Sequence, residues 1–239
     1  MIINAKGAAD FAEKYIIHSI WEGHYPPGSK LPAERELSEK IGITRTTLRE
    51  VLQRLARDGW LKIQHGKPTL VNNFWETSGL NILETIAELD QSGAPKLIEH
   101  LLMARSSVSA IYFRKGISQN PQKVVQFLSE KPKEDTAEAY CDYDYQLHRT
   151  LAFASNNPIY VLILNGFQKL YYRVGNYYFS SDEARATSRA FYKELLELAK
   201  QEDSKAVPAL IKEFNIKYNK IWHVLRQNLP TLTENSFNS

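Results

Sequence analysis

A run of threonine and arginine residues, from Thr44 to Arg49, carries the side chains best suited to a defined chemistry. Thr44 can cap a helix through its side-chain oxygen, and the apolar residues from Leu48 onward recur at helical spacing. Arg45 and Arg49 share another face with Thr46, and the helix has no acid there. Arginine can bridge guanine O6 and N7, and threonine can contact bases or phosphates. This face is predicted to be free to read DNA, with a capped and solvated helix start as the alternative.

Two further helices are expected before this segment. Apolar residues such as Phe11 and Ile16 keep helical spacing over residues 8–22, until glycine and proline end the pattern. A second, short helix is expected over residues 33–41, followed by Gly42, which suits a left-handed position after a helix. Because a tight turn separates it from the next helix, the pair is predicted to form a helix-turn-helix, whose second helix enters the major groove.

A β-hairpin is expected directly after the third helix, which Gly59 ends. The residues from Trp60 to Val71 form two short strands around a turn at His65-Gly66-Lys67. Glycine at the tip lets the backbone approach a duplex closely, while lysine and histidine can reach phosphate or a minor groove. Two helices, a recognition helix and a wing in this order favour DNA binding over the solvated alternative.

The positive charge of the chain is concentrated near its N-terminus. The formal net charge is +3; residues 1–74 hold eleven Lys and Arg against eight Asp and Glu, and residues 75–239 hold nineteen of each. A small basic module attached to a larger neutral one fits this distribution, and 239 residues suffice for two domains. No stretch approaches the roughly 20 apolar residues of a membrane span, and no signal sequence is recognised, so we expect a cytoplasmic protein.

The remainder of the chain is predicted to be an all-helical bundle. Apolar residues keep helical spacing, breakers such as Asn120-Pro121 arrive at intervals, and no alternating strand pattern competes. Six or seven helices are expected, the long ones at about 95–117, 134–155, 158–178, 183–201 and 205–228. The predicted fold is mainly α, with a winged helix-turn-helix and its small β-hairpin at 1–72, a connector at 73–78, an all-helical regulatory domain at 79–230 and a tail at 231–239.

Ten aromatic residues gather in the second half of the helical domain. They form either an ordinary aromatic core or a deep apolar cavity, with hydroxyl groups at its edge, for a long and mostly apolar ligand. Sequence spacing does not separate the two interpretations. The residues are Tyr171, Tyr172, Tyr177, Tyr178, Phe179, Phe191, Tyr192, Phe214, Tyr218 and Trp222.

Two segments of the N-terminal region carry a family signature. Leu31–Ser38 followed by Thr44–Leu52 resembles the signature of the GntR family of regulators. Within it, Arg45–Trp60 and the residues after Val71 are most similar to FadR-like regulators of fatty acid metabolism, and the likeness continues to about residue 230. By that resemblance the DNA contacts would come from Arg35, Thr44, Arg45, Thr46, Thr47 and Arg49, with His65, Gly66 and Lys67 from the wing.

The same resemblance implies an effector. FadR-like regulators bind long-chain fatty acyl-coenzyme A in the helical domain and then leave DNA; they repress fatty acid degradation genes and activate genes of unsaturated fatty acid synthesis. Here Asn215 and Tyr218 stand where the family has glycine and serine, and Gln227 replaces a basic residue, so a narrower pocket mouth and a weaker response are expected. The expected ligand-binding residues are Arg105, Tyr178, Asn215, Tyr218 and Trp222.

Asp144 and His148 have the spacing that sets two metal ligands on one helix face. Related helical domains bind a metal through one aspartate and three histidines, and this pair matches the first two. The other two positions hold Tyr192 and Asn215, which are poor transition-metal ligands. We therefore expect no metal and interpret the pair as an ordinary Asp–His contact. Cys141, the single cysteine, is expected to be a small core residue.

No enzymatic activity and no cofactor are expected, because no phosphate-binding loop, nucleophile elbow or paired catalytic carboxylates stand out. A GntR-type regulator that responds to a different small carboxylate or to a metal-bound ligand is the alternative, which Asn215 and Tyr218 keep open. One winged helix reads only a few base pairs, so we expect a homodimer on a palindromic operator.

Overall fold

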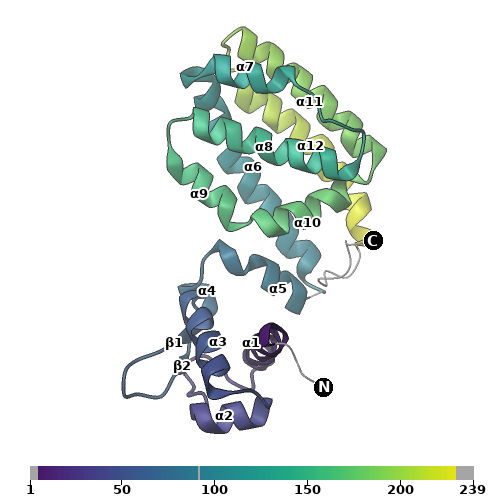
Figure 1. Cartoon of the computed structure of the whole chain (residues 1–239). Helices are drawn as coiled ribbons and strands as arrows, with labels where there is room; N and C mark the ends of the chain where they lie inside the picture. Colours follow the sequence, from purple (N-terminus) through teal and green to yellow (C-terminus); the bar gives the residue numbers. More distant parts are fainter. Residues whose placement is uncertain (1–4, 91, 230–239) are drawn as a thin grey trace. The chain divides into compact units, whose positions relative to one another are not determined.

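The computed structural model of the chain describes residues 5–90 and 92–229 (Figure 1). The chain divides into two compact units, Met1–Ile82 and Leu83–Ser239, which are described separately. Within the described ranges, no helix combines the length and the apolar character that a membrane crossing requires.

The first unit is a three-helix module with a small wing. An antiparallel pairing sets Leu61 opposite Val71. The predicted order of helices and hairpin is confirmed. The elements are α1 (Ala5–Trp21), α2 (Glu34–Ile41), α3 (Arg45–Arg57), β1 (Leu61–Lys62), β2 (Leu70–Val71), α4 (Phe74–Thr77) and the 3-10 turn η1 (Leu80–Ile82).

Helix α3 is held at its start and along its apolar stripe as the sequence predicts. The backbone N–H of Thr47 donates to the Thr44 hydroxyl, and Gly42 adopts φ 79° after α2. The stripe from Leu48 to Leu55 is buried against α1. The prediction of the apolar face of α1 is wrong at one position, because Phe11 is 58% exposed, while Ile16 is fully buried as expected.

The segment after the wing packs onto the first unit. The Phe74 ring lies between Trp21 and Trp60, with centroid distances of 5.9 and 4.6 Å. The hydroxyl of Thr77 donates to the carbonyl of Gly59 at 2.7 Å. Gly59 has φ 92°, and a Cβ there would lie 2.6 Å from the Thr77 carbonyl oxygen, so this turn requires glycine. The residues expected as a connector therefore complete the module.

The second unit is all-helical, which confirms the predicted fold class. Its described part contains eight α-helices rather than the six or seven expected. They are α5 (Leu83–Leu89), α6 (Ala94–Gln119), α7 (Pro121–Ser129), α8 (Ala137–Ala154), α9 (Pro158–Gly166), α10 (Gln168–Phe179), α11 (Asp182–Lys200) and α12 (Val207–Leu225), followed by the 3-10 turn η2 (Arg226–Asn228).

Helix α8 lies at the centre of this unit and packs against α6, α7, α9 and α10 (Figure 1). Its side chains Tyr145, Leu147 and Leu151 are fully buried, and Cys141 lies in the same core. The expected helix 158–178 is two helices. Phe167, with φ −122° and ψ 17°, separates them while its ring stays buried. Beyond the break, Tyr171 and Phe179 of α10 are buried in the core of the bundle.

Candidate DNA-reading face and ligand pocket

The candidate DNA-reading face of the first unit lies on α3 and the wing. Of the nine residues expected to contact DNA, eight are exposed and Thr47 is half-buried. Arg45 makes no side-chain hydrogen bond or ion pair within the described part of the chain. Its guanidinium, at the N-terminal end of α3, is thus available to a base edge.

Arg49 differs from this expectation. Its Nε lies 2.6 Å from Oε2 of Glu34, at the start of α2. The helix itself has no acid on this face, but the helix-turn-helix brings one from 15 residues earlier. The prediction that the whole face is free was therefore wrong at Arg49. Arg49 is therefore already paired with a carboxylate in this structure.

The wing tip projects a small basic surface. Gly66 adopts φ 69°, and the backbone N–H of Lys67 donates to the Gln64 carbonyl at 3.2 Å, which closes the turn. His65 and Lys67 are both exposed on it. A tight turn with an exposed lysine suits contact with a phosphate backbone.

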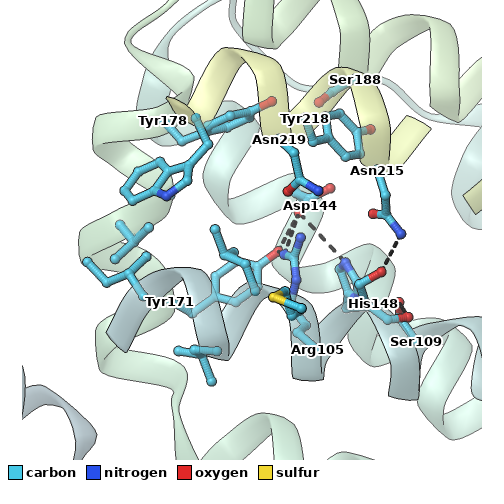
Figure 2. A pocket seen from close by; sticks show the side chains of 18 of the residues that line it. Arg105, Ser109, Asp144, His148, Tyr171, Tyr178, Ser188, Asn215, Tyr218 and Asn219 are labelled. Atoms are coloured by element: carbon cyan, nitrogen blue, oxygen red, sulfur yellow. Dashed lines mark hydrogen bonds and ion pairs between the residues drawn. The ribbon is translucent and has the colours of Figure 1, made fainter. Parts of the chain in front are cut away.

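A cavity of about 320 Å³ lies inside the second unit, between α6, α8, α10, α11 and α12 (Figure 2). Much of its wall is apolar, from α6 residues such as Leu102 to α10 residues such as Val174. All five residues expected to bind ligand line it: Arg105, Tyr178, Asn215, Tyr218 and Trp222. The aromatic cluster is therefore both core and cavity wall, because Phe191 and Tyr218 pack on each other while facing the same space.

The family of the chain follows from its two halves. The model of bacterial regulatory proteins of the gntR family matches residues 8–71, and the FadR C-terminal domain matches residues 72–233. The chain belongs to the GntR family. Its helical half is a FadR C-terminal domain. The resemblance to FadR-like members of the GntR family, inferred from the sequence, is confirmed.

Relatives support the assignment over nearly the full length of this GntR-family chain. It is similar to the fatty acid metabolism regulator protein of Shewanella pealeana, with 66% identity over 96% of this chain and 97% of the relative. The protein of the same name from Shewanella oneidensis is 65% identical over 97% of each chain. The structure of Lar, which controls the Listeria monocytogenes agr system, shares the fold, with a TM-score of 0.55, 16% identity, and coverage of 92% of this chain and 97% of that one.

A buried polar network at one end of the cavity was only partly foreseen (Figure 2). Asp144 accepts hydrogen bonds from the hydroxyl of Tyr171 and, at 2.9 Å, from that of Tyr192. Arg105 Nη1 lies 3.7 Å from the same carboxylate. Burial raises the pKa of both tyrosines well above the ordinary value, and Asp144 adds to this, so both remain donors.

His148 belongs to this network as a neutral ring. Its Nε2 lies 3.8 Å from Asp144 Oδ2, and its Nδ1 is 2.5 Å from the hydroxyl of Tyr112. Burial and then the positive charge of Arg105 lower its pKa to about 3, against the opposing effect of Asp144. Sequence spacing identified Asp144 and His148 as a pair but could not reveal the arginine and tyrosines that surround them.

The geometry bears on the metal hypothesis. Tyr192, at one position expected for a further histidine, donates to Asp144, and Asn215, at the other, donates to Ser106. Arg105 supplies the positive charge beside the carboxylate. Among residues 5–90 and 92–229, no group of three or more His, Cys, Asp and Glu side chains could hold a metal ion. Asp144 and the neutral His148 belong to a buried polar network in which Arg105 is the charged partner of the carboxylate.

Proposed function

We propose that the chain, a transcriptional regulator of fatty acid metabolism, binds a palindromic operator as a homodimer and is released from it by long-chain fatty acyl-coenzyme A. The regulator class follows from the GntR-type DNA-binding module joined to a FadR C-terminal domain. The relatives named fatty acid metabolism regulator protein support the physiological role. Acting on DNA, the protein works in the cytoplasm of a bacterium.

The observation that carries the effector assignment is the chemistry of the cavity wall. Three buried donors that line the cavity, Arg105 Nε, the Tyr178 hydroxyl and Trp222 Nε1, have no hydrogen-bond partner within the described part of the chain. Buried donors normally have partners, so their clustering supports a ligand with acceptor oxygens. The apolar wall beside them suits an acyl chain. A thioester with its chain offers both features.

On the DNA side, we propose that α3 reads bases through Arg45 and Arg49 and that Thr44, Thr46 and Thr47 hold it on the backbone. Arg35 and the wing residues His65, Gly66 and Lys67 would add phosphate or minor-groove contacts. Operator position decides the outcome: repression at fatty acid degradation genes and activation at genes of unsaturated fatty acid synthesis.

Fluorescence anisotropy on a labelled FadR-type palindrome tests this function. Titration with oleoyl-coenzyme A is expected to release the protein, while free coenzyme A leaves it bound. Size-exclusion chromatography with light scattering checks that the DNA-bound species is a dimer. Tight DNA binding that no thioester disturbs would overturn the effector and leave the DNA assignment intact.

Two side chains of the cavity wall, Tyr218 and Asn215, together with Gln227, which does not line the cavity, predict a weak response. Tyr218 is large and packs against Tyr178 and Phe191. Asn215 is tied to Ser106 across the wall. Gln227 brings no positive charge for a coenzyme phosphate, whose charge-assisted bond is about twice as strong as a neutral one. Release is therefore expected to need more oleoyl-coenzyme A than for relatives with glycine, serine and a basic residue at these positions.

A further inference from the structure

Two helices distant in sequence form facing parts of the cavity wall. Helix α6 contributes Leu102, Arg105 and Ser106, and α12 contributes Asn215 and Tyr218. The two helices pack against each other along the cavity. A ligand that enters the cavity would therefore lie against both helices.

A hydrogen bond between the two helices is present beside the cavity. The side-chain amide of Asn215 donates to the hydroxyl of Ser106, joining residues that lie 109 positions apart. Both side chains are half-buried, and both line the cavity. Ser106 lies within α6 and Asn215 within α12, so the bond links two helices.

We propose that the Asn215–Ser106 hydrogen bond is a latch that ties α12 to α6 when the cavity is empty and that an acyl ligand must open it. Asn215 then sets the sensitivity of the regulator without itself being a ligand contact. The inference rests on the proposed function and deepens it. It replaces the sequence-based expectation that Asn215 binds the ligand.

The size of the effect follows from the energy of one hydrogen bond. A typical intramolecular bond stabilises the state that contains it by about 0.5–1.5 kcal/mol, which corresponds to about a two- to tenfold change in an equilibrium constant. If the latch must open, its loss tightens ligand binding by that factor. If Asn215 instead contacts ligand, its loss weakens binding.

Ser106→Ala is the sharpest variant, because it removes the acceptor and changes little volume. Asn215→Leu removes the donor and keeps a side chain of similar size. Ser129→Ala is the matched control, since the hydroxyl of Ser129 on α7 donates to the Val125 carbonyl of its own helix, and Ser129 does not line the cavity. Far-UV circular dichroism and thermal melting of each full-length variant establish that it is folded.

Dissociation constants are measured by calorimetry with oleoyl-coenzyme A and, separately, with 1-anilinonaphthalene-8-sulfonate, which probes the cavity whatever its natural effector. The latch predicts that Ser106→Ala, Asn215→Leu and the double variant all tighten both ligands by the same factor of about two to ten, because they break one bond. Ser129→Ala changes neither.

Two results would overturn the latch: weaker or unchanged binding of both ligands in the single variants, or additive effects in the double variant. If oleoyl-coenzyme A binds none of the proteins, the proposed effector is wrong. The sulfonate probe then decides the latch by itself, since tighter binding in both single variants supports it and unchanged binding refutes it.

Discussion

Arg49 Nε of α3 lies 2.6 Å from Glu34 Oε2 of α2, so the recognition helix faces DNA with one of its two arginines already paired. Arg45, one turn earlier, has no such partner in the described residues. The two arginines are therefore expected to differ in how much DNA affinity they supply, although they occupy the same face.

Release of Arg49 should strengthen DNA binding. In Glu34→Gln the guanidinium no longer faces a carboxylate, and since exposed ion pairs contribute about 0.2–1 kcal/mol, the operator should bind up to about fivefold more tightly. Anisotropy at fixed salt measures this. Glu36→Gln, in the same turn of α2 and without an ion pair in the described structure, is the matched control. Equal effects of the two variants would indicate general charge removal instead of release of Arg49.

Arg45 should determine sequence preference. Its replacement by alanine is expected to cost about 1–3 kcal/mol of operator binding and to relax the preference at one base pair of each half-site. A binding selection with randomised operators reads both effects. A preference unchanged at every position would remove Arg45 from the base contacts.

Lys67 should contact the phosphate backbone of DNA and no base. Lys67→Ala is expected to weaken binding to all sequences by a similar factor and to reduce the slope of log affinity against log salt by about one. The measurement is a salt series on specific and random duplexes. An unaltered slope would show that Lys67 stays in solvent when DNA is bound.

The buried neutral His148 should make the helical unit sensitive to acid. Its pKa is about 3 in the folded state, below the ordinary value near 6.5, so the unfolded chain binds the extra proton between these limits. The contribution of the neutral His148 to the free energy of unfolding is fully present above pH 6.5. It is lost as the pH falls toward 3, by up to about 1.4 kcal/mol per pH unit. Urea unfolding at pH 7, 6 and 5 measures the slope.

His148→Gln should flatten that pH dependence while keeping a polar group near Tyr112. His100→Gln, at an exposed position of α6, is the control and should leave the slope as in the parent protein. Parallel slopes for the parent protein and His148→Gln would mean that another group causes the acid sensitivity.

Loss of the carboxylate beside Arg105 should destabilise the fold strongly. Asp144→Asn leaves a largely buried guanidinium without its counter-charge, and breaking a buried pair in this way costs about 3–5 kcal/mol. Urea denaturation of the full chain measures the loss. Asp142→Asn, exposed on the same helix, should cost far less, and equal losses would show that the pair contributes little.

Local signals in the sequence were enough to predict much of the first unit. The capping threonine Thr44, the glycine after α2 and the wing glycine each act through neighbours a few residues away. The Glu34–Arg49 pair could not be predicted in this way, because the turn between two helices decides which acid reaches the recognition face. Periodicity within one helix carries no information about the next.

The second unit was predictable in class and less so in detail. The break at Phe167 follows Gly166, the last residue of α9, but no proline is present and the phenylalanine itself is buried, so packing against the bundle also holds the break in place. The network around Asp144 draws Arg105 from α6, Tyr171 from α10 and Tyr192 from α11. The pattern of each helix predicts that it is amphipathic. It does not predict which polar side chains of the four helices meet in the core between them.

The packing of Phe74 between Trp21 and Trp60 decides where the chain can be cut. A fragment that stops at Val71 would expose both indole rings and would lack the hydrogen bond from the Thr77 hydroxyl to the Gly59 carbonyl. A fragment that stops at Ile82 keeps the Phe74 ring and this hydrogen bond. Proteolysis that spares the DNA-binding half should therefore cleave beyond the short helix α4 and not at the end of the wing, although the hairpin is where the recognisable motif ends.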